Sequence, residues 1–356
     1  MSIAYKNARL CYNNWVDSAT LQTSASVSNF PSSNLLSGIR SKVWKAKGTF
    51  EISAANQKVY INATSYNIPI GSYDVTSLIT AFNTATGQTL SRNSLGRFVI
   101  TLGSSGTVNF TSNTSAIWDT LGFFRVADET GTIFTADERR YNNGEWIKVD
   151  LGFPQSLDFS SIIAPSGEIF SASTAEIRLQ GNNVDEWTSP QVNELMEVSG
   201  AGAFIAPQTT LTTCRYWRIR IKDYKNPSIS VAVAYMGTGF ITINTNIATG
   251  FNRVRSDQSL RLYSEGGQLY VDRRPKILSL TSMQVQFLEG DELKDTEQLV
   301  EDLGIGTPFF ICLDPSKSVS SSLSQMTHYV ELDGDVTFSH VIGSYYNLAF
   351  QLREVL

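Results

Sequence analysis

The chain has 356 residues, 42% of them hydrophobic and 17% charged, and its formal net charge is -5. This length exceeds one ordinary β-sandwich, so two or three domains are expected, and the hydrophobic content excludes a disordered protein. The acidic balance argues against a nucleic-acid-binding protein, and no apolar run approaches the roughly 20 residues that would insert into a membrane.

The first residues, Met1 to Leu10, lack the apolar stretch of a secretory signal. We therefore expect a protein that is made in a cytoplasm, and that either stays there or is assembled into a particle released by lysis. Residues 3–12 are predicted to form a strand. Residues 25–36 are predicted to be an extended loop, because Pro31 interrupts any regular element.

Residues 48–136 have a pattern of their own. Apolar residues recur at i, i+3, i+4 and i+7 over 74–83, which predicts an amphipathic helix with Asp74 as its N-cap and Gly87 as its end. We also expect strands and a short helical turn, and the two strands that flank 103–106 are predicted to form a hairpin. The strands are expected at 58–62, 66–73, 97–102 and 107–111, and the helical turn at 115–122.

Three later segments alternate between apolar and polar residues, as half-buried antiparallel strands do. They contain Trp-x-x-Val-Asp-Leu-Gly from Trp146, then Ile-x-Leu-Gln-Gly-Asn from Ile177, then Arg-Tyr-Trp-Arg-Ile-x-Ile-x-Asp from Arg215. This order resembles the discoidin-like jelly roll, the galactose-binding-like module of the coagulation factor C-domain type. The resemblance extends to the strand 229–239, whose Gly237-Thr-Gly239 is predicted to be a turn.

The resemblance implies a mainly β fold with a discontinuous jelly roll. Its two parts are 1–47 and 137–240, and the small α+β domain 48–136 is inserted between them. That insertion is similar to β-α-β-β modules of viral and phage structural proteins. The remaining residues, 241–356, are predicted to form a β-rich C-terminal domain with a helix over 291–304, and they resemble the C-terminal domains of phage tail and baseplate proteins.

Residues that carry chemistry are few. The chain has two histidines, His328 and His340, and neither lies at the spacing of a metal site or a catalytic triad. The three cysteines are far apart and predict buried free thiols. We therefore expect no enzyme and no cofactor. A structural calcium at Asn182, Asn183, Asp185 and Glu186 remains an alternative, because many modules of this family hold one.

Glycan-binding members of this family use loops at one end of the sandwich. An exposed aromatic ring contacts the sugar face, and arginine or amide groups contact its hydroxyls. By residue type, the candidates are Trp15, Arg40, Trp187 and Tyr224. The competing interpretation is that Trp15 and Trp187 cover a core and that the insertion occupies the binding loops.

The sequence thus predicts a structural component of a bacteriophage virion, in the tail tip or baseplate or as a minor tail protein. Its expected partners are copies of itself, in a trimer or hexamer, and neighbouring tail or receptor-binding proteins. Its expected location is the virion, after synthesis in the host cytoplasm. The alternative is an adhesin that contacts a host-surface glycan through the jelly-roll loops.

Overall fold

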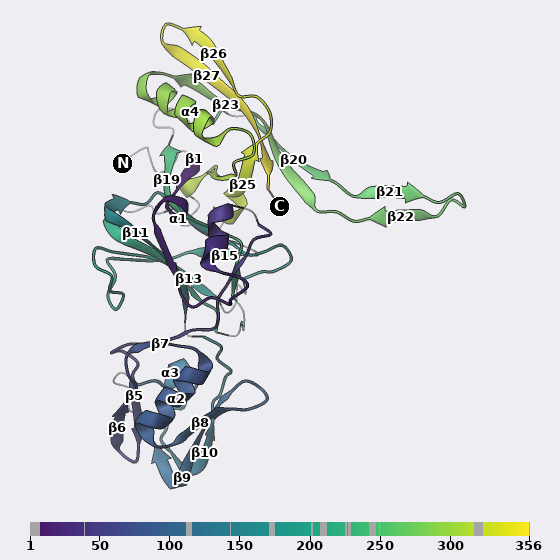
Figure 1. Cartoon of the computed structure of the whole chain (residues 1–356). Coiled ribbons are helices and arrows are strands. Elements are labelled where there is room, and N and C mark those ends of the chain that lie inside the picture. Colours follow the sequence, from purple (N-terminus) through teal and green to yellow (C-terminus); the bar gives the residue numbers. More distant parts are fainter. Residues whose placement is uncertain are drawn as a thin grey trace.

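The structure is a computed structural model that describes residues 8–38, 40–111, 116–142, 144–170, 175–200, 202–206, 212–224, 226, 229–241, 247–248, 250–316 and 323–355. Three parts follow one another along the molecule (Figure 1). The inserted unit lies at one end, a β-sandwich lies in the middle, and a β-rich part with a projecting hairpin lies at the other end. In the described part of the chain, no helix is long and apolar enough to cross a membrane.

The central part is a sandwich of two antiparallel sheets. Its elements are β1 (Arg9–Asn14), α1 (Trp15–Ser18), β2 (Thr20–Thr23), the 3-10 helix η2 (Ser32–Ser37), β3 (Trp44–Lys45), β11 (Glu145–Ser156), β12 (Phe159–Ile163), β13 (Glu176–Asn182), β14 (Val192–Leu195), β15 (Glu197–Ser199), β16 (Gly202–Ile205), β17 (Thr213–Lys222), β18 (Ser230–Val231) and β19 (Val233–Ile241). One sheet has the order β14-β13-β17-β11-β2, and the facing strands have the order β15-β16-β12-β19-β1. A single hydrophobic core, which includes Trp44 and Met236, fills the space between the sheets.

Alternation along β17 decides which residues enter this core. Trp217, Ile219 and Ile221 are buried and face inward, and Val149 of β11 pairs with Trp217 across the ladder. Successive strand residues point to opposite faces. Tyr216 on the other face is therefore only half-buried. The predicted alternation of this segment is confirmed.

The inserted unit has a five-stranded sheet, one helix of three turns, and a core of its own. Its elements are β4 (Phe50–Ile52), β5 (Lys58–Ile61), β6 (Thr64–Asn67), β7 (Gly71–Tyr73), α2 (Val75–Thr86), β8 (Thr89–Arg92), β9 (Phe98–Val108), α3 (Trp118–Leu121) and β10 (Glu129–Thr135). The helix prediction is confirmed: Asp74 accepts a hydrogen bond from Ser77 N at 2.8 Å, and Gly87 ends the helix with φ +66°. The predicted capping residue of the later helical turn, Ser115, lies outside the described residues.

The hairpin predicted across 103–106 is wrong. Strand β9 continues through this segment with a bulge, because its antiparallel pairing with β10 shifts from Thr101 to Gly106 and skips 102–105. Glycine allows this passage, because a Cβ at Gly106 would lie 2.7 Å from the side-chain oxygen of Asn62. Small residues here mark a close approach of two strands rather than a turn.

The C-terminal part continues a sheet of the sandwich. Its elements are β20 (Asn252–Asp257), β21 (Leu260–Tyr263), β22 (Leu269–Asp272), β23 (Lys276–Leu288), α4 (Gly290–Leu303), β24 (Phe309–Cys312), α5 (Leu323–Met326), β25 (Thr327–Leu332), β26 (Thr337–Ile342) and β27 (Tyr345–Glu354). Strand β1 pairs with β19 on one side and with β24 on the other. The path of the larger sheet therefore runs without a break from β15 to β20, and the helix predicted over 291–304 is confirmed as α4.

Aromatic packing fixes this junction between the sandwich and the C-terminal part. Phe310 of β24 lies 5.6 Å from both Phe159 and Tyr235, and 4.8 Å from Tyr329 of β25, measured between ring centres. Such pairs stabilise a core beyond the area that they bury. The two parts are therefore held rigidly where they meet.

The fold-class prediction is confirmed: the protein is mainly β, with a sandwich interrupted by a small α+β unit and followed by a β-rich part. The three cysteines are buried and free, as predicted. Two local predictions are wrong. The loop 25–36 contains η2, and Gly237-Thr-Gly239 lies inside β19 rather than in a turn. The reason at Gly237 is steric, because a Cβ there would lie 2.0 Å from Asn13 O of β1.

Candidate functional site

The four residues predicted to bind glycan lie in four different environments. Trp15 begins α1 and belongs to the sandwich core, with 3% of its surface exposed. A ring in that position cannot lie against a sugar. We therefore reassign Trp15 from the predicted binding set to the core, as the competing interpretation had it.

Trp187 lies in the loop after β13 and is half-buried. Its Nε1 donates to Asp185 Oδ1 at 2.8 Å, and the Arg218 guanidinium lies 4.2 Å from the centre of its ring. Burial lowers the pKa of Arg218 to about 10, which leaves it charged near neutral pH. The ring of Trp187 thus covers a buried cation of the sheet.

Tyr224 lies just after β17, where the sandwich meets the inserted unit. The Arg140 guanidinium lies 3.9 Å from its ring centre and pairs with Asp119 of α3 at 3.3 Å. The carbonyl of Tyr224 accepts a hydrogen bond from Tyr141 N at 3.0 Å. These contacts give Tyr224 a structural role at the junction.

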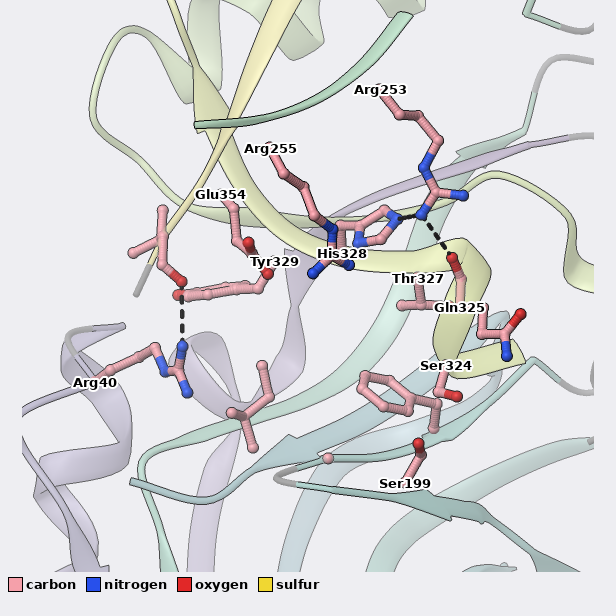
Figure 2. Close-up of a pocket in the computed structure, with 14 residues that line it drawn as sticks. Arg40, Ser199, Arg253, Arg255, Ser324, Gln325, Thr327, His328, Tyr329 and Glu354 are labelled. Atoms are coloured by element: carbon pink, nitrogen blue, oxygen red, sulfur yellow. Dashed lines mark hydrogen bonds between the residues drawn. The ribbon is translucent and has the colours of Figure 1, made fainter. Parts of the chain in front are cut away.

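Arg40 alone of the four lines a large cleft. The cleft has a volume of about 580 Å³ and lies between the sandwich and the C-terminal part (Figure 2). Small-molecule sites usually have roughly 300–1,000 Å³. Residues of both parts line it: Arg40, Ile163, Ser199, Gly202, Phe204, Arg253, Arg255, Ser324, Gln325, Thr327, His328, Tyr329, Glu354 and Val355.

Two arginines enter the cleft from β20. Arg253 and Arg255 are two residues apart, so a strand presents them on the same face. Figure 2 shows both side chains on the side of the C-terminal part, with Arg40 across the cleft. Both β20 arginines are exposed, so a ligand can reach their guanidinium groups.

His328 of β25 is buried beneath these arginines. Its Nε2 lies 3.0 Å from Arg253 Nη2, which also donates to Gln325 O at 3.0 Å. Because a guanidinium can only donate, Nε2 must be the acceptor and the imidazole is neutral. Burial, with the charges of Arg253 and Arg255, lowers the pKa of His328 to about 4.

The positive charge of the cleft is only partly balanced. Arg40 Nη1 donates to the carbonyl of Val355 at 3.3 Å, and burial lowers the pKa of Arg40. Arg255 makes no hydrogen bond or ion pair with any residue that the structure describes. Among the described residues, the lining contributes one carboxylate, Glu354, which accepts a hydrogen bond from Leu278 N at 3.1 Å. Three guanidinium groups therefore share the cleft with one acid.

Hydroxyl and amide groups complete the lining. Ser199, Ser324, Gln325 and Thr327 supply them, and Ser324 also donates to Glu197 Oε1 at 2.7 Å. Figure 2 shows Gln325 and Ser324 on α5 and Ser199 on the opposite wall. The arrangement can hold an anionic group at the arginines and hydrogen-bond several hydroxyl groups beside it.

The loop considered for calcium uses its oxygens within the protein. Asp185 Oδ2 pairs with Lys148 at 2.6 Å, and Asn183 Oδ1 accepts from Arg215 N at 3.1 Å. Asn182 Oδ1 accepts from Asn183 N, and Glu186 Oε1 accepts from Thr188 N. Across the described ranges, no three His, Cys, Asp or Glu side chains cluster as metal ligands.

The sequence did not indicate Arg253, Arg255 or His328 as site residues, and at His328 it showed no spacing of a metal site or catalytic triad. The sequence contained one local indication: in Arg253-Val-Arg255, a strand would place two cations on the same face. This pattern does not show which part of the protein that face lies against. The cleft forms because β20 and β25 belong to the sheet that continues from the sandwich.

No family model and no curated protein matches this chain. Among solved structures, it is similar to a histidine mutant of the lectin-binding domain of lectinolysin complexed with Lewis b. The identity is 10%, the match covers 64% of this chain and 98% of that chain, and the TM-score is 0.29. The lectin domain of lectinolysin complexed with Lewis B antigen has 9% identity, coverage of 64% and 96%, and a TM-score of 0.29. A fucolectin from striped bass (Morone saxatilis) serum has 11% identity, coverage of 60% and 80%, and a TM-score of 0.22. These values are too low to say which ligand this chain binds.

Proposed function

We propose that this protein binds saccharides that carry a carboxylate, and that the cleft between the sandwich and the C-terminal part is the binding site. The observation that carries the proposal is the convergence of Arg40, Arg253 and Arg255 on one cleft with a single carboxylate, Glu354. Arginine forms paired, charge-assisted hydrogen bonds with carboxylates. Arg255, which is exposed and makes no ion pair in the described part of the chain, is the primary contact.

The remaining lining favours a sugar over a simple anion. Ser199 and Gln325 are exposed, and their side chains make no hydrogen bond with the described residues, so both can serve sugar hydroxyls. Tyr329 and Phe204 contribute aromatic surface to the same cleft. Binding without turnover is part of the proposal, because glycosidic hydrolysis needs two carboxyl groups and the described residues of the lining supply only Glu354.

A matched pair of oligosaccharides tests the proposal. Isothermal titration with tetragalacturonate should show binding, and the same tetrasaccharide with its carboxylates reduced to alcohols should bind at least about tenfold more weakly, the loss expected for one charge-assisted hydrogen bond. Inorganic phosphate should compete only weakly, because it makes no contact with the hydroxyl-rich wall. Equal binding of both sugars, or binding of neither, would overturn the proposal.

A virion role is the second candidate. The specific observation in its favour is the long hairpin of β21 and β22, which projects from the body (Figure 1). Its leucine and tyrosine side chains are exposed. Exposed apolar surface of this kind marks an assembly contact. We propose that the protein is a structural component of a bacteriophage tail that also contacts a host glycan. Detection of the chain by mass spectrometry in purified particles would test this, and its absence from them would contradict it.

A further inference from the structure

The hairpin of β21 and β22 leaves the body as an arm (Figure 1). Among the described residues, these two strands pair only with each other. The far end of the arm is closed by its own hydrogen bonds, from Ser264 N to Gln268 O and from Gly267 N to Ser264 O, both at 2.9 Å. The arm is therefore a formed element whose strands have no further strand partner in the described part of the chain.

Both faces of the arm carry apolar side chains. Leu262 lies opposite Tyr270, and Tyr263 lies opposite Leu269, so each pair occupies one face. Leu262 is 61% exposed and Tyr263 is 70% exposed. A two-stranded hairpin is marginally stable in water by itself, and its free edges and apolar faces favour association. A partner that covers the arm would stabilise it.

The arm is also basic. From Leu260 to Lys276, the hairpin and the residues that follow it, the chain has four arginines and lysines against two acidic residues. Arg261, Arg273, Arg274 and Lys276 line, together with Asp257, a hollow of about 570 Å³ at the base of the arm. Arg274 pairs with Asp272 at 3.0 Å. The arm therefore fits a partner surface that is apolar and acidic.

The opposite end of β23 offers such a surface, which we call the acceptor patch: Phe287, Ile342 and Tyr345. Ile342 pairs with Tyr345 across the strands, and the rings of Phe287 and Tyr345 are 6.3 Å apart. A bulge in β23 turns Phe287 outward, with φ +59° and 50% exposure, while the next residue, Leu288, is fully buried. Ile342 is 68% exposed.

Acidic groups border the acceptor patch. Glu289 lies against it and accepts a hydrogen bond from Ser344 Oγ at 3.3 Å. Helix α4 begins one residue later and carries six acidic residues against one lysine. Asp291 and Asp295 are exposed on its first two turns. The patch thus has the opposite charge to the arm and the same apolar character.

We propose that the arm of one copy of this chain binds the acceptor patch of a second copy. The base of the arm and the acceptor patch lie at opposite ends of β23, whose 13 residues span about 40 Å. Each contact therefore joins two different surfaces, an arm and an acceptor patch. Such contacts either close, as a two-fold pair that exchanges arms or as a larger ring, or continue as an open filament. The acidic-saccharide cleft is not used in this contact.

Complementary variants test the direction of the contact. Leu262→Asp removes the apolar arm, and Ile342→Asp removes the acceptor patch. Analytical ultracentrifugation should show that the unaltered protein assembles as its concentration rises, and that either variant raises the concentration needed by at least about tenfold. A mixture of the two variants should form a dimer and nothing larger, because only one intact arm and one intact patch can meet.

Two controls keep the result specific. Leu95→Asp changes an equally exposed leucine of the inserted unit and should assemble like the unaltered protein. Charge reversal of Arg273 and Arg274 to Glu should weaken assembly, and combination with Asp291→Lys and Asp295→Lys in the same chain should restore it. A monomer at every concentration would overturn the proposal, as would assembly indifferent to Leu262→Asp or equally weakened by Leu95→Asp.

Discussion

Two basic surfaces of this protein differ in what neutralises them. On the outer face of the sandwich, Arg215 pairs with Asp150 through two contacts of 2.8 and 3.0 Å, and Lys148 pairs with Asp185 at 2.6 Å. In the cleft, Arg253 contacts a carbonyl and a neutral imidazole, and Arg255 has no ion pair among the described residues. The same residue type is a satisfied structural group in one place and an available one in the other.

This difference follows from the strands that surround each surface. Strands β11, β13 and β17 are neighbours, and their register places a polar partner beside cations of the outer face. Glu176 lies opposite Lys222, and Gln180 lies opposite Arg218. Strand β20 is the last strand of its sheet and pairs only with β23. Its arginines, Arg253 and Arg255, therefore face the sandwich across the cleft, where the wall includes the hydroxyl group of Ser199.

The largest effect is expected from the cleft pair. Arg253→Ala combined with Arg255→Ala should weaken binding of tetragalacturonate by about 100-fold, because two charge-assisted contacts of roughly 1.5 kcal/mol each are lost. The matched control is Arg178→Ala, which removes an arginine paired with Glu176 at 2.7 Å on the sandwich face. Titration calorimetry should find unchanged affinity for that control, and equal losses in both would contradict the comparison.

The second effect is a dependence of stability on pH. The pKa of His328 is lowered from 6.5 to about 4, so the folded protein resists a proton that the unfolded chain accepts. The free energy of unfolding therefore has its full value, with respect to this histidine, above pH 6.5. It decreases as the pH falls toward 4, by about 3 kcal/mol in total. Urea denaturation between pH 7 and 4.5 should show this decline, and His328→Gln should flatten it. An unchanged slope in that variant would mean that other groups cause the decline.

A smaller effect is expected at Arg218, which is buried on the sandwich face. Its Nε donates to Gln180 Oε1 at 2.7 Å, and its guanidinium lies against Trp187. Arg218→Ala leaves the Gln180 acceptor without this donor and should lower the free energy of unfolding by about 1–3 kcal/mol. Saccharide binding should stay the same. A loss of binding without a loss of stability would place the site on the sandwich instead.

The smallest effect on binding is expected from the aromatic residues that sequence analysis selected. Trp187→Ala and Tyr224→Ala should change the affinity for tetragalacturonate by less than about twofold, since neither lines the cleft. Glycan titration of both variants checks this. A loss of about tenfold or more in either would return the site to the jelly-roll loops.

The sequence predicted most of the fold where local pattern and tertiary packing agree. The alternation around Trp217 and the apolar stripe from Val75 to Phe82 each determine one buried face. Two of the errors lie at glycines. The pattern predicted turns at Gly106 and Gly237. Both glycines instead lie inside strands, where they allow another segment of the same chain to approach closely. Sequence alone does not distinguish these two uses of glycine, because the neighbour comes from a distant segment.

The site was predictable only in part. Arg40 was selected by residue type, and the structure places it in the cleft. Trp15 was selected in the same way, and it lies in the core. Arg253 and His328 come together because β20 and β25 join one sheet through β23 and β27. That sheet order is set by long-range pairing, which no local periodicity records.

The most direct test of the proposed site is a nuclear magnetic resonance titration of the two histidines. His328 lines the cleft, and His340 lies on β26 and does not. Addition of tetragalacturonate should shift the imidazole signals of His328 and leave those of His340 in place. Binding that moves neither signal would put the saccharide elsewhere on the protein and contradict the assignment of the cleft.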